Sequence, residues 1–357
     1  MFRTGNGLGR AARSCVEALE LEGFSPIAVD TSSLLGQASL EPSVALSELD
    51  PKGGGTMILF ANPPEIERCL MGLGVRRWHR WRIIGSWAWE TPVAPAGWRR
   101  QTSFISEIWA PSRFVAEAFE AAYDTPVHTV PHYVKTVPDT VISGTNPDTS
   151  GQSATLPVHI LTLADARSSL TRKNPIAAVK MFQAAFPSGE PAKLTVKCRN
   201  LDLFPDYAAA LRAATGADPR IQLLDNTLTD AEHAALIDSC DILLSPHRSE
   251  GFGLPLAEAM AAGKCVVATG WSGNMEFMAG GGAVLLPYTL VLVDDPTGVY
   301  DPEPGAVWAE PDIDAGVAAL KALAGDPAGR IALGHAARRA IADALPPALY
   351  RKALEAR

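Results

Sequence analysis

Short apolar runs alternate with stretches of helical hydrophobic periodicity along almost the whole chain. In the first half, the pattern at 9–22 places Ala12, Cys15, Val16 and Leu19 on one face of a helix. Ser112 can cap a further helix that reaches residue 122. Strands are expected at the apolar runs 26–29, 57–60, 83–86 and 108–109. This alternation is typical of parallel α/β construction.

The alternation stops at residues 136–156 and then restarts. That stretch is rich in Thr, Ser, Gly, Asn, Asp and Pro, which favours a linker or a long surface excursion. The tail from residue 328 is alanine-rich and helical, and Pro346 with Pro347 is expected to break it into two helices. Between them we expect strands at 158–163, 194–197, 221–224, 242–245 and 265–268, and helices at 174–186, 205–215, 229–239 and 253–262.

These patterns predict an α/β protein of two Rossmann-like domains that face each other across a cleft. The length of 357 residues is typical of two domains. We place the first domain at 1–135, the linker at 136–156 and the second domain at 157–342, and the helix at about 343–357 is a candidate to pack back on the first domain. Ligands are expected in the cleft, at the carboxyl ends of the strands.

Composition and charge argue against a membrane-spanning protein and against a nucleic-acid-binding protein. The chain is 47% hydrophobic and 20% charged, as in ordinary soluble proteins, and no apolar run approaches the roughly 20 residues of a membrane span. Met1 leads almost directly into glycines, so no signal peptide is expected. The net charge of −8 argues against a nucleic-acid partner. The five cysteines lie far apart, which predicts free buried thiols in a reducing cytoplasm.

The most informative run is SPHRSEGFGLPLAEAMAAG at residues 245–263, where a strand leads through a glycine-flanked turn into a helix. Glycines allow the backbone to approach a ligand closely, and the free N–H groups at a helix start favour phosphate. Glu250 and Glu258 stand on either side of the helix start, and carboxylates accept hydrogen bonds from hydroxyls. A site that binds both phosphate and several hydroxyl groups would suit a nucleotide-sugar.

This run resembles the paired-glutamate motif of the retaining family 4 glycosyltransferases (glycosyl transferases group 1) of the GT-B fold. The strand at 265–269 (CVVAT) and the block SGNMEF at 272–277 continue the resemblance, and RKNP at 172–175 is similar to the element that opens the first donor-domain helix. In the first half, three blocks are similar to a bacterial polysaccharide-type subgroup: GLGRAAR at 7–13, GSWAWETP at 85–92 and EIWAPSRFV at 107–115.

One departure concerns the start of the chain. The family has a full strand before the glycine loop, whereas only residues 1–4 precede Gly5 here. We expect either that the native chain begins upstream of Met1 or that the first strand is absent.

The resemblance implies roles for residues of the second half. Glu250 is expected to accept hydrogen bonds from the donor sugar, and Glu258 from the ribose. Lys173 is the first candidate for a cation on the diphosphate, with Arg167 or Arg172 as the second. A fixed cation there stabilises the charge that grows on the leaving group. No metal or other cofactor is expected. The remaining donor-binding candidates are Gly251, Phe252, Gly253, Leu254 and Asn274, the last with a structural role as a helix cap as its alternative.

On the acceptor side, the candidates are Gly7 in the glycine loop together with Trp87, Trp89 and Glu90. Aromatic faces suit sugar rings. We expect one of the two tryptophans to belong to the core instead. The segment 287–311 resembles a subgroup-specific insertion, and no role is assigned to it.

A separate basic and aromatic cluster, RRWHRWR, covers Arg76 to Arg82. One interpretation is peripheral contact with an anionic membrane on the inner face, since basic residues and tryptophan favour that surface. Another is contact with a pyrophosphate-linked lipid acceptor. The plain alternative is a solvated helix whose tryptophans pack inward.

The sequence thus predicts a retaining hexosyltransferase that needs no metal. It would move a sugar from a nucleotide-diphosphate donor to a saccharide or a lipid-linked glycan, as in cell-surface polysaccharide or lipopolysaccharide synthesis. Two alternatives stay open: a GT-B nucleotide-sugar epimerase, and a non-catalytic nucleotide-sugar-binding relative.

Overall fold

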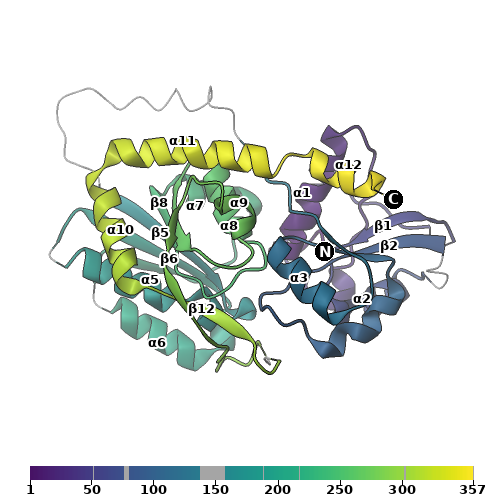
Figure 1. Cartoon of the computed structure of the whole chain (residues 1–357), viewed down its shortest axis with the longest axis horizontal. Coiled ribbons are helices and arrows are strands. Elements are labelled where there is room, and N and C mark those ends of the chain that lie inside the picture. The colour runs from purple at the N-terminus through teal and green to yellow at the C-terminus, as the bar shows by residue number, and fades with distance from the viewer. Residues whose placement is uncertain are drawn as a thin grey trace.

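The computed structural model describes residues 1–50, 52–75, 80–136, 157–187, 189–216, 218–300 and 303–356. Two parallel sheets, one in each half of the chain, form the frame (Figure 1). The confirmed fold class is therefore α/β with parallel sheets. Residues 136–156, predicted to be a linker, lie outside the described residues apart from Thr136.

The first half holds a four-stranded parallel sheet in the order β1-β2-β3-β4. Successive side chains point to opposite faces of a strand. Accordingly, Ile83 and Ile108 face the core under α2 and α3, while Ile84 and Trp109 face α1 and α12. The elements in chain order are α1 (Gly7–Leu21), the 3-10 turn η1 (Ser33–Leu35), β1 (Gly55–Leu59), α2 (Pro63–Gly72), β2 (Trp81–Ser86), η3 (Ala96–Phe104), β3 (Glu107–Ala110), α3 (Arg113–Ala122) and β4 (Val127–Thr129).

The second half holds a six-stranded parallel sheet in the order β10-β9-β8-β5-β6-β7. Ile242 and Leu244 of β8 face the core shared with α5, α6 and α10, and Leu243 faces the core shared with α8 and α11. The strands are β5 (Val158–Asp165), β6 (Ala192–Arg199), β7 (Ile221–Leu224), β8 (Ile242–Ser245), β9 (Cys265–Thr269) and β10 (Val284–Leu286). The helices between them are η5 (Ala166–Ser168), α4 (Leu170–Lys173), α5 (Pro175–Ala185), η6 (Leu201–Leu203), α6 (Pro205–Thr215), α7 (Asp230–Asp238), α8 (Leu254–Ala261) and α9 (Met275–Met278).

The segment 287–311, left without a role by the sequence, forms a two-stranded antiparallel ribbon. Its strands are β11 (Tyr288–Leu292) and β12 (Val307–Pro311), paired from Tyr288–Pro311 to Leu292–Val307. The chain then continues into α10 (Ile313–Gly325) and α11 (Pro327–Ala344). Trp308 and Tyr300 are buried and pack with Val293 in a small cluster that also meets Trp89 of the first half. The segment therefore contacts the first half.

The C-terminal helix α12 (Ala348–Glu355) crosses to the first half, after a break at Pro346 and Pro347 (Figure 1). Its Tyr350 is 1% exposed and lies 6.0 Å from the ring of Trp109. Arg351 donates to the carbonyl of Glu22 at the end of α1. One continuous apolar cluster, from Ala12 through Phe252 to Tyr350, joins the two halves.

The strand predicted at 26–29 is wrong. This stretch has no ladder; a single hydrogen bond joins the amide of Ser47 to the carbonyl of Ala28. Pro26 cannot donate to a ladder, and Ile27 is 72% exposed, so the apolar run is not a buried strand.

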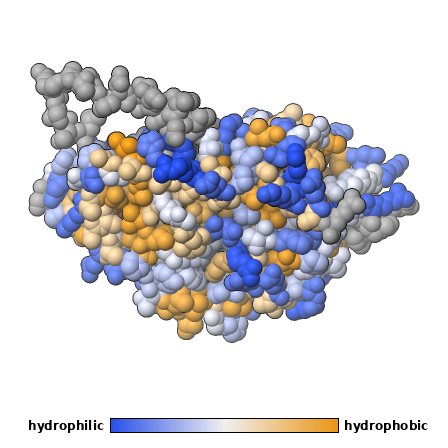
Figure 2. Space-filling model, turned by 45° about the horizontal axis from the view of Figure 1, so that its top comes forward, coloured by the Kyte–Doolittle hydropathy of each residue, from blue (hydrophilic) through white to orange (hydrophobic). Residues whose placement is uncertain are grey.

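The described surface carries both hydrophilic and hydrophobic residues on each half (Figure 2). Apolar atoms on the surface are normal in globular proteins. Among the described residues, no helix is both long and apolar enough to cross a bilayer.

We expect Tyr350→Ala to lower the free energy of unfolding by about 3–5 kcal/mol, because it removes a buried ring that fixes α12 on the first half. Urea denaturation measures the change. Lys352→Ala, an exposed position on the same helix, is the control and should stay within about 0.5 kcal/mol of wild type. Equal stability of the two variants would show that α12 does not stabilise the fold.

Candidate active site at the start of helix α8

Glu250 lies in the loop between β8 and α8 and is paired with two cations of α4. Its carboxylate is 2.5 Å from the ammonium of Lys173 and 3.3 Å from the guanidinium of Arg172. The side chain of Glu250 is 8% exposed and that of Arg172 is 2% exposed. Arg172 also donates to the carbonyls of Ser168 and Ser249. The structure thus brings Glu250 together with Lys173, 77 residues away in the sequence, and with its neighbour Arg172.

The electrostatics of this group follow from burial and pairing. Burial disfavours the charged carboxylate, but Lys173, Arg172 and His247 outweigh it and lower the pKa of Glu250 to about 2. Burial lowers the pKa of the Lys173 ammonium, with Glu250 opposing that effect. Because the carboxylate and the cations each compensate the burial of the other, the group is held as an ion pair.

A second loop holds the backbone of Glu250 in place. Ser272, with φ of 77°, accepts a hydrogen bond from the amide of Glu250, and the amide of Gly273 donates to its carbonyl. A Cβ at Gly273 would lie 2.1 Å from the carbonyl oxygen of Gly251 and 2.8 Å from that of Glu250. Only glycine therefore permits this approach of the two loops.

Asn274 is fully buried, and its side chain bonds to the carbonyl of Thr269 and to His247. It sits at the N-cap of α9 without a side-chain capping bond. The internal hydrogen bonds of Asn274 position the loop, and its donor contact stays a prediction. His247, which the sequence analysis did not single out, links this loop to the Glu250 loop.

The glycine-flanked turn provides a close backbone approach. A Cβ at Gly251 would lie 2.6 Å from the carbonyl oxygen of Trp89, and Gly253 has φ of +89°. The hydroxyl of Ser112 donates to the carbonyl of Gly251, which joins the turn to the first half. Gly253 is the N-cap of α8 and gives no side-chain cap to the N–H groups of that helix start. Such a start carries a partial positive charge.

Phe252 and Leu254, both predicted to bind the donor, have buried side chains. The ring of Phe252 lies 5.0 Å from His132 and 5.2 Å from Phe277. These side chains anchor the turn, so that their backbone is the part available to a ligand.

Glu258, one helical turn into α8, meets the first half. Its carboxylate lies 3.2 Å from the guanidinium of Arg10 on α1 and 2.9 Å from the ring nitrogen of His233. Burial raises the pKa of Glu258, but Arg10 and His233 outweigh this and lower it. Gly7 opens α1 close to Leu254, since a Cβ there would lie 4.0 Å from its side chain. The sequence did not identify Arg10 and His233 as partners of Glu258.

The acceptor-side candidates have different surroundings. Trp87 is 1% exposed and packs edge-on against Trp98, Phe119 and Tyr123, so it is a core residue. Trp89 is half-buried and donates to the carbonyl of Val93. β2 ends at Ser86, so both tryptophans lie beyond the strand.

Glu90 connects the first half to the Glu250 group. Its carbonyl accepts a hydrogen bond from Ser249, and its carboxylate accepts one of 2.6 Å from the hydroxyl of Tyr300. The ring of Tyr300 lies 5.8 Å from the guanidinium of Arg172 and 5.5 Å from the ring of Trp89. Tyr300 thus completes the group, and nothing in its local sequence indicated this role.

Two other predicted sets are not brought to Glu250. Arg167 is exposed on η5, and its amide bonds to Asp165. Residues 76–79 of the basic cluster lie outside the described residues. Arg82 is bonded to Glu107 and to the carbonyl of Leu354, and Arg80 is exposed. Membrane contact by this cluster stays a prediction.

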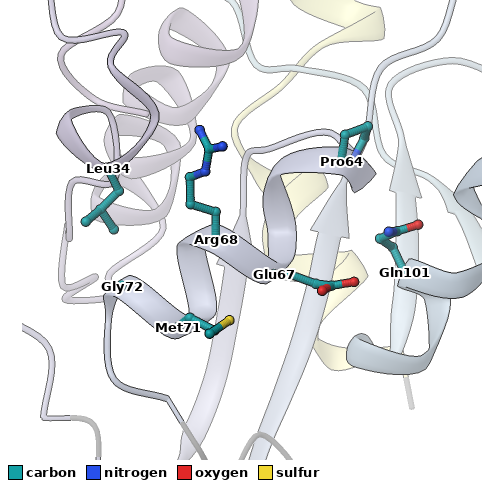
Figure 3. Close-up of a pocket in the computed structure, with 7 residues that line it drawn as sticks. All are labelled: Leu34, Pro64, Glu67, Arg68, Met71, Gly72 and Gln101. Carbon is teal, nitrogen blue, oxygen red and sulfur yellow. The ribbon is translucent and has the colours of Figure 1, made fainter.

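Two hollows are described on the surface. One, of about 660 Å³, lies on the first half, where Arg68 and Met71 project from α2 and Gln101 comes from η3 (Figure 3). Its lining includes none of the residues around Glu250. The other, of about 470 Å³, is lined by residues of both halves, among them Ser112 and Ser272. Ser112 bonds to Gly251 and Ser272 to Glu250, so this second hollow adjoins the site.

Residues 171–301 match the model of the family described as glycosyl transferases group 1. The expected resemblance to glycosyl transferases group 1 is thereby confirmed. The matched segment contains Arg172, Lys173, Glu250, Glu258 and Tyr300. No curated protein matches the chain.

The solved structures that are similar to the chain have the GT-B fold. A glycosyltransferase from Rickettsia africae shares 14% identity with a TM-score of 0.63, over 98% of this chain and 94% of its own. Anabaena HepE, solved with UDP and glucose, shares 15% with a TM-score of 0.57, over 84% of this chain and 77% of its own. A variant of S. aureus TarM, solved with fondaparinux, α-GlcNAc-glycerol and UDP, shares 12% with a TM-score of 0.57, over 84% of this chain. The chain spans about half (54%) of the TarM length.

We expect Gly273→Ala to push the two loops apart and to lower the free energy of unfolding by about 1–3 kcal/mol, as for other overpacked sites. Thermal or urea denaturation measures this. The control is Gly280→Ala, where a Cβ meets nothing within 4 Å, and it should be neutral or slightly stabilising. If both variants behave alike, the close approach of the loops does not constrain this site.

Glu250→Gln removes the negative partner of the buried Arg172 and of the partly buried Lys173, so we expect the free energy of unfolding to fall by about 3–5 kcal/mol at neutral pH. The pKa of Glu250 lies below its ordinary value of 4.5. Its stabilising contribution is therefore complete above that value and is lost as the pH falls towards about 2. The difference in unfolding free energy between wild type and variant should shrink across this range.

Urea denaturation at stepwise lower pH measures this difference, and Glu120→Gln, an exposed carboxylate on α3, is the control. A difference for Glu250→Gln that does not change with pH would contradict the charge pairing.

Proposed function

We propose that the chain is a retaining glycosyltransferase that takes a nucleotide-diphosphate sugar as donor and a saccharide or lipid-linked glycan as acceptor. The observation that carries this is the Glu250 group: a buried carboxylate and two cations at an uncapped helix start, between two Rossmann-like halves. The match to glycosyl transferases group 1 over residues 171–301 supports the reaction class. Similar structures solved with UDP and a sugar support the donor class.

The group supplies the chemistry that glycosyl transfer needs. The bond between the anomeric carbon and the phosphate oxygen breaks, and negative charge develops on the departing nucleoside diphosphate. Lys173, Arg172 and the start of α8 are fixed positive groups that stabilise this charge in the transition state. We propose that they do so without a metal ion.

Donor binding would exchange the partners of the ion pair. Lys173 would turn from Glu250 to the diphosphate, and the released carboxylate of Glu250 would accept hydrogen bonds from the sugar hydroxyls. Glu258 would accept hydrogen bonds from the ribose, with Arg10 and His233 holding its carboxylate in place. Because Arg10 comes from the first half, the same contact would couple donor binding to the position of that half.

The acceptor hydroxyl would approach from the side of the first half. Its oxygen bonds to the anomeric carbon on the face that the phosphate leaves, and its proton passes to the departing phosphate oxygen. This route retains the anomeric configuration and needs no covalent nucleophile from the protein. We place the reaction in the cytoplasm, which fits the five free buried cysteines, in the synthesis of cell-surface glycans.

A thermal-shift screen with UDP, GDP, ADP and their sugar conjugates tests the donor site. A ligand at a hundredfold excess over its dissociation constant stabilises the native state by about 2.7 kcal/mol, so one nucleotide family should raise the melting temperature. Glu258→Ala should lose this shift because it removes the ribose contact. Asp238→Ala, an exposed carboxylate at the end of α7, is the control and should keep it. A screen in which no nucleotide shifts the wild type would refute the proposed donor site.

A further inference from the structure

The hollow of about 470 Å³ is lined by residues of both halves, and we name it the aromatic pocket. Its lining includes Phe114, Glu117, Trp271, Ser272, Glu276 and Tyr288. Phe114 and Glu117 come from α3 of the first half, and the other residues come from the second half. The pocket is therefore complete only when the two halves are together.

Three aromatic rings form a row in this pocket. The ring of Trp271 lies 5.1 Å from that of Phe114 and 6.3 Å from that of Tyr288. Tyr288 is 41% exposed, and the other two rings are half-buried. These neighbouring rings are only partly buried. They therefore present flat apolar faces to a molecule in the pocket.

Charged groups surround the rings. The amide of Arg113 donates to the carboxylate of Glu276 at 2.7 Å, and its guanidinium donates to Glu117 at 2.9 Å. A carboxylate can accept several hydrogen bonds, so Glu117 and Glu276 keep acceptor capacity for hydroxyl groups. Flat apolar faces with hydroxyl acceptors at their edge match a sugar ring, which has apolar C–H faces and a rim of hydroxyls.

The pocket also adjoins the reaction centre. Ser272, part of its lining, accepts a hydrogen bond of 2.8 Å from the amide of Glu250. Ser112, which lines the pocket from the first half, donates to the carbonyl of Gly251. Ser112 and Ser272 thus each contact both the pocket and the turn that carries Glu250.

We propose that the aromatic pocket binds a sugar ring of the acceptor glycan, stacked on Trp271 and Tyr288 and bonded through its hydroxyls to Glu117 and Glu276. This inference rests on the proposed function, because it names the acceptor of the same reaction. The ring in the pocket belongs to the part of the glycan next to the acceptor hydroxyl. The pocket therefore selects saccharides of at least two units.

The experiment uses an array of defined oligosaccharides without lipid, probed with the labelled full-length protein. Wild type should bind a subset of the array. Tyr288→Ala should weaken that binding about tenfold, because stacking on the ring is lost, whereas Tyr288→Phe should keep it. Leu292→Ala is the matched control, since Leu292 is 69% exposed on the same strand and does not line the pocket.

Two results would overturn the proposal: a wild type that binds no saccharide on the array, or binding that Tyr288→Ala leaves unchanged. The nucleotide thermal shift of the same variants separates this failure from a failure of the proposed function. Suppose that Tyr288→Ala keeps the thermal shift with nucleotide and also binds saccharides as wild type does. Only the aromatic pocket is then refuted. If no nucleotide shifts the wild type, the donor site fails as well.

A competitor then identifies the source of the sugar ring. A saccharide that the protein binds is prepared in two soluble forms, free and linked to a short prenyl diphosphate. We compare how strongly each form displaces the labelled protein from the array. Tighter competition by the linked form supports a lipid-linked glycan, and equal competition supports a free or polymeric glycan. Competition by the prenyl diphosphate alone at the same strength would overturn the assignment to a sugar.

Discussion

The buried pairing of Glu250 with Lys173 and Arg172 is the constraint on which the architecture around it depends. A buried charge is costly unless it is paired and hydrogen-bonded, so the loop that carries Glu250 must meet α4 closely. The loop at 271–274 holds the backbone of Glu250 from behind, and the first half closes on it through Ser112 and Glu90. These contacts fix the backbone on both sides of the paired carboxylate.

The ribbon at β11 and β12 adds a second layer to this arrangement. Tyr300 reaches back to Glu90 of the first half and lies against Arg172, while Trp308 lies against Arg248, which is bonded to Glu310 and to the carbonyl of Thr171. Arg172 of the site and the neighbouring Arg248 therefore each lie against an aromatic ring. Electrostatic interactions are stronger in such surroundings.

Much of this could be predicted from the sequence, for identifiable reasons. Strands such as Ile242–Ser245 and Cys265–Thr269 are short, apolar and bounded by turn residues, and the Glu250 turn has its glycines where a close approach requires them. The strand prediction at 26–29 was wrong because hydrophobicity alone does not show whether a partner strand exists. Tyr300, Arg10 and His233 could not be found because their roles come from contacts between segments far apart in the chain. The burial of Trp87 beside a half-exposed Trp89 likewise depends on packing.

The path of the chain has a mechanical consequence. It passes from the first half to the second between β4 and β5, and returns between α11 and α12, where Tyr350 fastens the last helix to Trp109. Two connections restrict the relative movement of two halves more than one connection does. The two halves are thus connected at two places, and any movement of one relative to the other must be accommodated at both. A change at Pro346 or Pro347 would act on one of these connections without altering any residue of the Glu250 group.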